Sequence, residues 1–137
     1  MRALFAFLAD YALAHPDGKM YIIGGGVELL RPPSFPYVHP SISLATRLEF
    51  TPTESGRQRT IEVHAIDSDG NPFAPPATIQ ATPQRNPEHP TLPVSVQFVL
   101  NMQGLAFQDP GSRSFSILVD GQEIASVPLH VVQGQQV

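Results

Sequence analysis

The sequence predicts an all-β protein, a single antiparallel β-sandwich of seven or eight strands over residues 1–137. Fifteen prolines and ten glycines are spread along the chain, and proline at this density excludes long helices. The segments between them alternate apolar and polar residues, as half-buried strands do. Turn residues recur at the spacing of an immunoglobulin-like or C2-like sandwich, and a closed barrel is the alternative.

The composition restricts the possible partners. A chain of 137 residues with 42% hydrophobic residues can bury a core without metal or disulfides. The absence of cysteine excludes thiolate chemistry and suits the cytoplasm, which we predict as the location; export by a short signal peptide over residues 2–14 is the alternative. The net charge of -4 and the lack of a basic cluster argue against nucleic acid or a membrane as partner.

The first thirty residues predict a pair of strands. We expect one strand over Arg2–Asp10 and a second over Lys19–Leu30, joined by a connection with a short helical turn at Tyr11–Ala14. The turn residues His15–Lys19 separate the two strands. Three consecutive glycines, Gly24–Gly26, lie inside the second strand and indicate a bulge or a close approach of two backbone segments.

The middle of the chain contains the clearest alternation. Residues 41–50 alternate strictly, which predicts a half-buried strand. Further strands are expected over Arg57–Asp67 and Pro93–Met102, and a short edge strand is expected around Ile79 and Ala81, where neighbouring prolines are tolerated. The predicted inward face of the 41–50 strand consists of Ile42, Leu44, Thr46, Leu48 and Phe50.

A hairpin is predicted at the carboxyl end. Strands over Ser114–Val119 and Glu123–Val131 flank Asp120-Gly121, a favoured pair for a two-residue turn with positive φ. The apolar residues of the returning strand fall out of phase by one position after Ile124, which predicts a bulge near Ala125-Ser126.

Several of these signals together resemble a bacterial family that is a domain of unknown function. The resemblance lies in Asp10-Tyr11, in the turn Asp17-Gly18-Lys19 followed by Ile22-Ile23-Gly24, and in the hairpin Ile117–Gly121. Further shared positions are Phe35-Pro36, Leu48-Glu49-Phe50 with Glu54, Asp69-Gly70 and Pro110-Gly111. The resemblance implies a β-sandwich and brings no activity, cofactor or site residue.

The loop from Arg31 to Pro40 is the predicted interaction surface. It is rich in proline and carries Phe35 and Tyr37, which together with Arg31 would form a protruding apolar patch. Such patches often mark contacts between proteins. The alternative is structural, with Phe35 closing one end of the sandwich.

Asp67 and Asp69 are weak candidate metal ligands. With Asn71 they present oxygen atoms at alternate positions, which is a pattern that suits calcium. The twelfth position of an EF-hand loop counted from Asp67 is Thr78, so that motif is absent, and a second loop with Asp109 or Asp17 would have to complete a site. The alternative is a polar turn closed by its own side chains.

No motif predicts catalysis. The sequence lacks a G-x-S-x-G elbow, and no catalytic residue or cofactor is predicted. We therefore expect a non-catalytic protein-interaction or assembly module, with a protein partner or self-association. The alternative is a calcium-dependent or small-ligand-binding sandwich.

Overall fold

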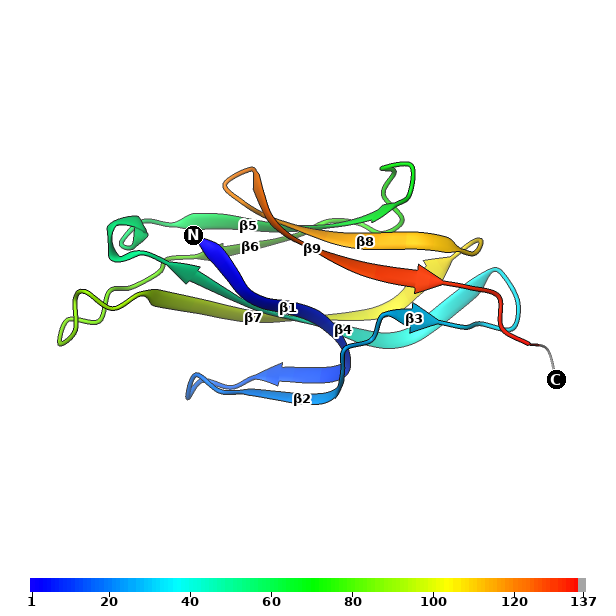
Figure 1. The fold of residues 1–137 in the computed structure, drawn as a ribbon, viewed down its shortest axis with the longest axis horizontal. Coiled ribbons are helices and arrows are strands. Elements are labelled where there is room, and N and C mark those ends of the chain that lie inside the picture. Colours follow the sequence, from blue (N-terminus) through cyan, green and yellow to red (C-terminus); the bar gives the residue numbers. More distant parts are fainter. Residues whose placement is uncertain (136–137) are drawn as a thin grey trace.

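The computed structural model describes residues 1–135, in which nine strands and one short 3-10 helix form two stacked sheets (Figure 1). No helix in this part of the chain is long and apolar enough to cross a membrane. The elements are β1 (Arg2–Ala14), β2 (Met20–Gly25), β3 (Leu29–Leu30), β4 (Tyr37–Phe50), η1 (Pro52–Glu54), β5 (Arg59–Asp67), β6 (Ala77–Ala81), β7 (Val94–Phe107), β8 (Gly111–Val119) and β9 (Gln122–Val131).

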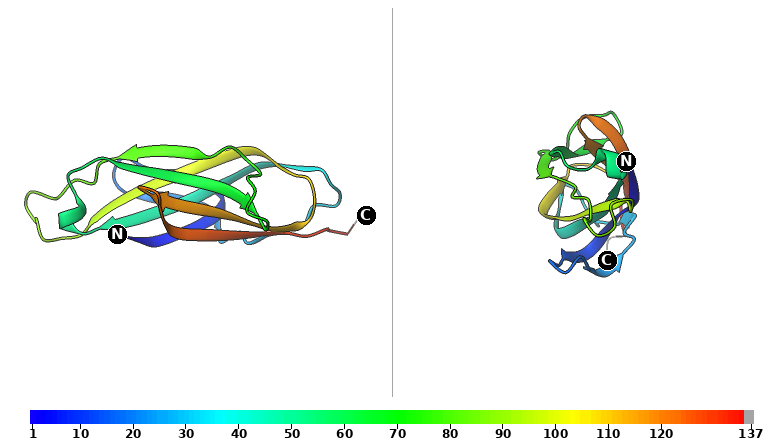
Figure 2. Two further views of the ribbon diagram at one scale, coloured as in Figure 1. Left: turned by 90° about the horizontal axis from the view of Figure 1, so that it is seen from above. Right: turned by 90° about the vertical axis from the view of Figure 1, so that its left-hand side faces the viewer.

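The two sheets confirm the predicted sandwich and rule out the alternative of a closed barrel, but the described residues form nine strands where seven or eight were expected. One sheet has four strands in the order β2-β1-β4-β7, and the other has five in the order β3-β9-β8-β5-β6. All pairings are antiparallel except that of β3 with β9. The sandwich is elongated along its strands, and the loops gather at its two ends (Figure 2).

The core lies between the sheets and follows the alternation of the strands. All five residues predicted on the inward face of β4 are buried, and Ile61, Phe115 and Leu129 of the other sheet are fully buried with them. Each large apolar side chain removed from water contributes about 1.5–3 kcal/mol. No α-helix packs on either sheet in the described part of the chain, so apolar contact between the two inner faces is the main source of stability.

Strand β1 continues beyond its predicted end, and this corrects the helical turn expected at Tyr11–Ala14. Residues 2–9 of β1 pair with β4, and residues 9–14 pair with β2. Between these two parts β1 bends back sharply (Figure 1). The resulting β1–β2 hairpin lies against the outer face of the four-stranded sheet (Figure 1). The Ala12 N–H donates to Ser43 Oγ at 3.2 Å, and Arg47 and Gln97 donate to the hairpin turn. Cross-strand pairing with β2 therefore overrides the local preference of the alanines for helix.

The second predicted strand, Lys19–Leu30, is wrong as one element. It divides into β2 of one sheet and β3 of the other, and Gly24–Gly26 is where the chain leaves the first sheet. Gly24 and Gly26 have φ values of +64° and +89°, and the N–H groups of Gly26 and Val27 both donate to the Leu8 carbonyl. The glycines thus permit the close backbone approach that the triplet predicted.

The remaining strands differ from the prediction mostly at their ends. β4 begins at Tyr37, and β7 extends to Phe107. The edge strand β6 and the final hairpin are confirmed, with φ values of +50° at Asp120 and +84° at Gly121. The bulge is also present, because Ile117 pairs with Ala125 and Leu118 with Glu123.

Glu54 fastens the amino terminus to the loop after β4. Its carboxylate accepts hydrogen bonds from the Met1 ammonium at 2.8 and 3.0 Å and from the Thr51 N–H at 2.9 Å. The bond from the ammonium, followed by the backbone bond from Thr51, lowers the pKa of Glu54 from 4.5 to about 2. The carboxylate form therefore stabilises the folded state.

We expect Glu54→Gln to lower the free energy of unfolding by about 1.5–2 kcal/mol at pH 7, near the lower end of the contribution of a hydrogen bond to a charged group because Glu54 is partly exposed. The folded-state pKa lies below the unfolded one, so the stabilisation is present above about pH 5 and is lost as the pH falls toward 2. Urea unfolding of both proteins across this range measures the difference. Glu49→Gln, which removes the exposed ion pair with Arg2, is the control and should cost little. If the two proteins differed in unfolding free energy as much at pH 2.5 as at pH 7, the ionised Glu54 carboxylate would not be the source of the stabilisation.

We expect Gly24→Ala to destabilise the protein by at least about 1 kcal/mol more than Gly26→Ala, although both positions have positive φ. A Cβ at residue 24 would collide with the Asp10 carboxylate, whereas a Cβ at residue 26 would meet nothing within 4 Å. Thermal unfolding of the two variants measures the difference. In an Asp10→Gly background, which also removes the Asp10 Cβ that would lie 3.0 Å away, the excess cost of Gly24→Ala should disappear, and its persistence would show that the collision is not the cause.

Candidate functional site

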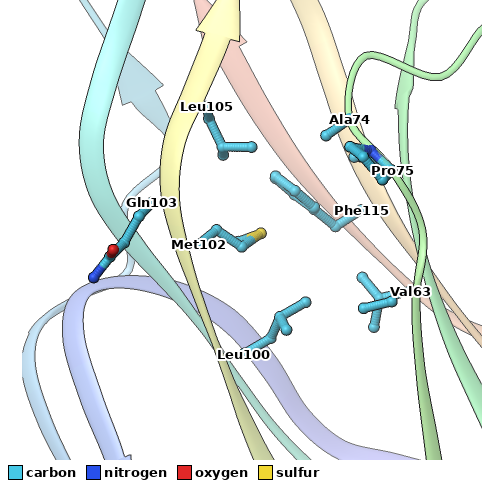
Figure 3. Close-up of a pocket in the computed structure, with 10 residues that line it drawn as sticks. Val63, Ala74, Pro75, Leu100, Met102, Gln103, Leu105 and Phe115 are labelled. Atoms are coloured by element: carbon cyan, nitrogen blue, oxygen red, sulfur yellow. The ribbon is translucent and has the colours of Figure 1, made fainter.

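An apolar cleft opens between the two sheets along their β6 and β7 edges (Figure 3). Its volume is about 260 Å³. In the close-up, Leu100, Met102 and Leu105 point from β7 toward Val63 and Phe115 of the opposite sheet. The other lining residues are Ala65, Ala74, Pro75, Ala77 and Gln103. The cleft therefore exposes part of the core rather than a polar surface.

Prolines and a short strand keep this edge of the sandwich open. β6 pairs with β5 only over Arg59–Val63, so the rest of β5 has no continuous neighbour on that side. The segment before β6 contains Pro72, Pro75 and Pro76, which lack the N–H that a further ladder would need. It contributes one isolated bridge, between Ile66 and Pro72. The short β6 and the prolines before it therefore explain why the cleft beside β7 stays open.

β7 borders the cleft with a long unpaired edge. It runs over fourteen residues and, in the part of the chain that the structure describes, pairs with β4 alone. Its sequence contains neither a charged residue nor a proline. Natural edge strands are usually protected by such residues or by being short, as β6 is. The backbone of β7 is thus free to pair with another strand.

The predicted interaction surface is only partly exposed. Phe35 is half-buried and packs against the core, while Arg31 is exposed. The Tyr37 ring stacks on Phe107 at a centroid distance of 6.5 Å, and its hydroxyl lies 2.9 Å from His39 Nδ1. Two of the three side chains thus help to close this end of the sandwich.

The candidate metal ligands Asp67 and Asp69 lie in a turn that supplies its own hydrogen bonds. Asp67 Oδ1 accepts from the N–H groups of Asp69 and Asn71, each at 2.9 Å. Asp67 and Asp109 do line one hollow, but Arg113 lies there as well and donates to Asp109 Oδ1 at 2.9 Å. A guanidinium already supplies the positive charge, so the geometry favours the structural interpretation of this turn.

The histidines of the strand surfaces lie in separate pairs with neighbouring side chains. Within residues 1–135, no cluster of three or more His, Asp or Glu side chains could hold an ion. His64 contacts Glu62 at 3.0 Å, and His130 contacts Ser112 at 3.1 Å, in pairs on the strand surfaces. Neither pair borders the cleft, whose lining consists of apolar side chains and Gln103.

The predicted strands over Arg57–Asp67, Pro93–Met102 and Ser114–Val119 contain five of the ten residues that line the cleft, but the sequence did not predict the cleft itself. Val63 lies in the core and Leu100 packs against it, but the open edge beside them depends on which strands become neighbours, and alternation within a segment does not report that. Two features of the sequence could have indicated the open edge: the absence of charged residues in β7 and the prolines before β6.

Comparison with solved structures gives a distant likeness. The Pseudomonas fluorescens alkylpurine DNA glycosylase AlkC, bound to DNA containing an abasic site analog, matches with a TM-score of 0.46 and 12% sequence identity. The match covers 75% of this chain and 27% of the glycosylase chain. No curated protein matches the sequence.

The family comparison covers nearly the whole chain. The model of a family of unknown function, DUF6941, matches residues 4–132, which extend from β1 to the residue after β9. The β1–β2 turn, the cleft and both sheets lie within this range, except for the first two residues of β1. The chain belongs to the family DUF6941.

Proposed function

We propose that the protein is a non-catalytic interaction module that binds an extended segment of a partner protein by strand addition to β7. The observation that carries the proposal is the unpaired, uncharged edge of β7 beside a cleft into the core. In strand addition, backbone hydrogen bonds provide affinity, and pockets for alternate side chains provide specificity. This edge supplies both.

The spacing of the cleft residues defines the expected ligand. Leu100 and Met102 are two positions apart and both line the cleft, so an added strand would place every second side chain over the same groove. Opposite them lie Val63 and Ala77, which are small enough to leave room for an aliphatic side chain. The ligand is therefore a segment in which small or branched apolar residues alternate with polar ones.

A small apolar ligand is the second candidate, and the apolar lining of the cleft favours it. About 260 Å³ lies slightly below the usual volume of a drug-sized site, roughly 300–1,000 Å³. Such a ligand would contact the apolar lining of the cleft and would form no hydrogen bonds with the backbone of β7. Dependence of binding on backbone hydrogen bonds therefore separates the two candidates.

The test uses peptides selected from a displayed library of random extended sequences and synthesised with a fluorescent label. We expect alternating apolar peptides with dissociation constants of roughly micromolar size. Ala77→Phe fills the cleft and should weaken binding by about tenfold or more. Thr78→Phe adds a ring to the other face of the same strand, where residue 78 is exposed, and is the matched control. Fluorescence polarisation measures both affinities.

Peptides methylated at single backbone nitrogens complete the test. Methylation at alternate positions should abolish binding, and methylation between them should be tolerated, because only alternate N–H groups of an added strand face its neighbour. Equal affinity of all methylated peptides would favour a ligand held by the groove alone. Selection of no peptide, or unchanged binding by Ala77→Phe, would contradict the proposal.

A further inference from the structure

The opposite edge of the same sheet is also open, and it carries an exposed apolar face. β2 is the edge strand, and it contains neither a charged residue nor a proline. Tyr11 pairs with Ile23, and Leu13 pairs with Tyr21, so the four side chains share one face of the β1–β2 hairpin. They are exposed by 44–65%. Figure 1 shows β2 on the far side of the hairpin from the five-stranded sheet.

The hydrogen bonds of the hairpin show which backbone groups of β2 face outward. The His15 N–H donates to the Lys19 carbonyl at 2.8 Å, and the Ala12 N–H turns away from β2 to Ser43 Oγ. Because bonded and non-bonded pairs alternate in an antiparallel ladder, Tyr21 bonds to β1. The N–H and C=O groups of its neighbours, Met20 and Ile22, therefore point to the free edge.

We propose that two copies of the chain associate through their β2 edges, antiparallel, with the two-fold axis at Tyr21. In this register Met20 of each copy pairs with Ile22 of the other, so the outward backbone groups of both are satisfied. The two Tyr21 side chains become direct neighbours on the exposed face, in a non-bonded pair, where side chains approach most closely. A symmetric contact of this kind closes with two copies.

The charges at the ends of β2 are complementary in the same register. Lys19 precedes the strand, and Asp10 lies beside Gly24 near its other end. Antiparallel pairing places the Lys19 ammonium of one copy near the end of β2 where the Asp10 carboxylate of the other copy lies. Gly24 and Gly25 have no side chains to block the approach.

The contact is small, which sets the expected affinity. One short strand and a few half-exposed side chains fall below the roughly 800 Å² per partner of a standard interface. The dimer should therefore be weak and dependent on concentration. It uses the edge opposite β7, so each copy keeps its cleft open.

Sedimentation velocity on the full chain at about 10–500 µM tests this association, and a shift from monomer to dimer with a dissociation constant of roughly 10–100 µM is expected. Tyr21→Lys places two like charges at the axis and should raise the dissociation constant by about tenfold or more. Tyr11→Lys puts the same charge on the same face one strand away and should change it by less than about threefold. Thermal unfolding confirms that both variants are folded.

Cysteine cross-linking tests the register. The chain has no cysteine, so Tyr21→Cys introduces a single thiol. Across a non-bonded pair the two Cα atoms lie about 4.5 Å apart, within the range of a disulfide. Mild oxidation should therefore give a covalent dimer, and Leu13→Cys should give none.

Three results would overturn the proposal. The chain could remain monomeric at 500 µM. Tyr11→Lys could disrupt the dimer as strongly as Tyr21→Lys, which would indicate face-to-face packing of the hairpins. Tyr21→Lys could leave a dimer intact, which would place the contact elsewhere, β7 included. Peptide binding by Tyr21→Lys distinguishes this failure from failure of the proposed function, because the β7 cleft is unchanged in that variant.

Discussion

The pairing of β4 on both of its edges is the constraint on which the rest of the structure depends. β1 and β7 flank it, and its inward face supplies five buried residues, including Phe50. Pro40, which cannot donate to a ladder, lies near one end of β4, where β1 no longer pairs and β7 is the only neighbour. β4 thus fixes the register of its sheet, and the sheet ends in two edges, β2 and β7.

The fold class was predictable because alternation within a segment reports a half-buried strand directly. The β4 face and the Asp120-Gly121 turn are examples, since both depend on residues close together in the sequence. The division of residues 19–30 between two sheets was not predictable from alternation, which does not identify the neighbouring strand. Ser43 and Ala45 show the same limit. Both are fully buried although they lie on the outer face of β4. The β1–β2 hairpin, which is far from them in the sequence, covers them.

The candidate site was less predictable than the fold. Its residues are ordinary core residues, and the cleft exists because no strand lies between β6 and β7. An interaction surface was predicted at the Arg31–Pro40 loop because aromatic residues in a proline-rich loop often protrude. Phe35 and Tyr37 instead find partners on Phe107 and in the core, contacts that no local pattern encodes. A surface at this loop remains a prediction.

The four edges of the two sheets are protected unequally, and this difference links the two proposals. β3 has two residues, and β6 has five with prolines on both sides, so neither offers a long ladder to another chain. β2 is also short, but like β7 it contains neither a charged residue nor a proline. An unprotected edge strand can pair unspecifically with other chains unless a defined partner covers it. A segment at β7 and a second copy at β2 would cover both, so the concentration of unprotected edges in one sheet is consistent with a module that assembles in two directions.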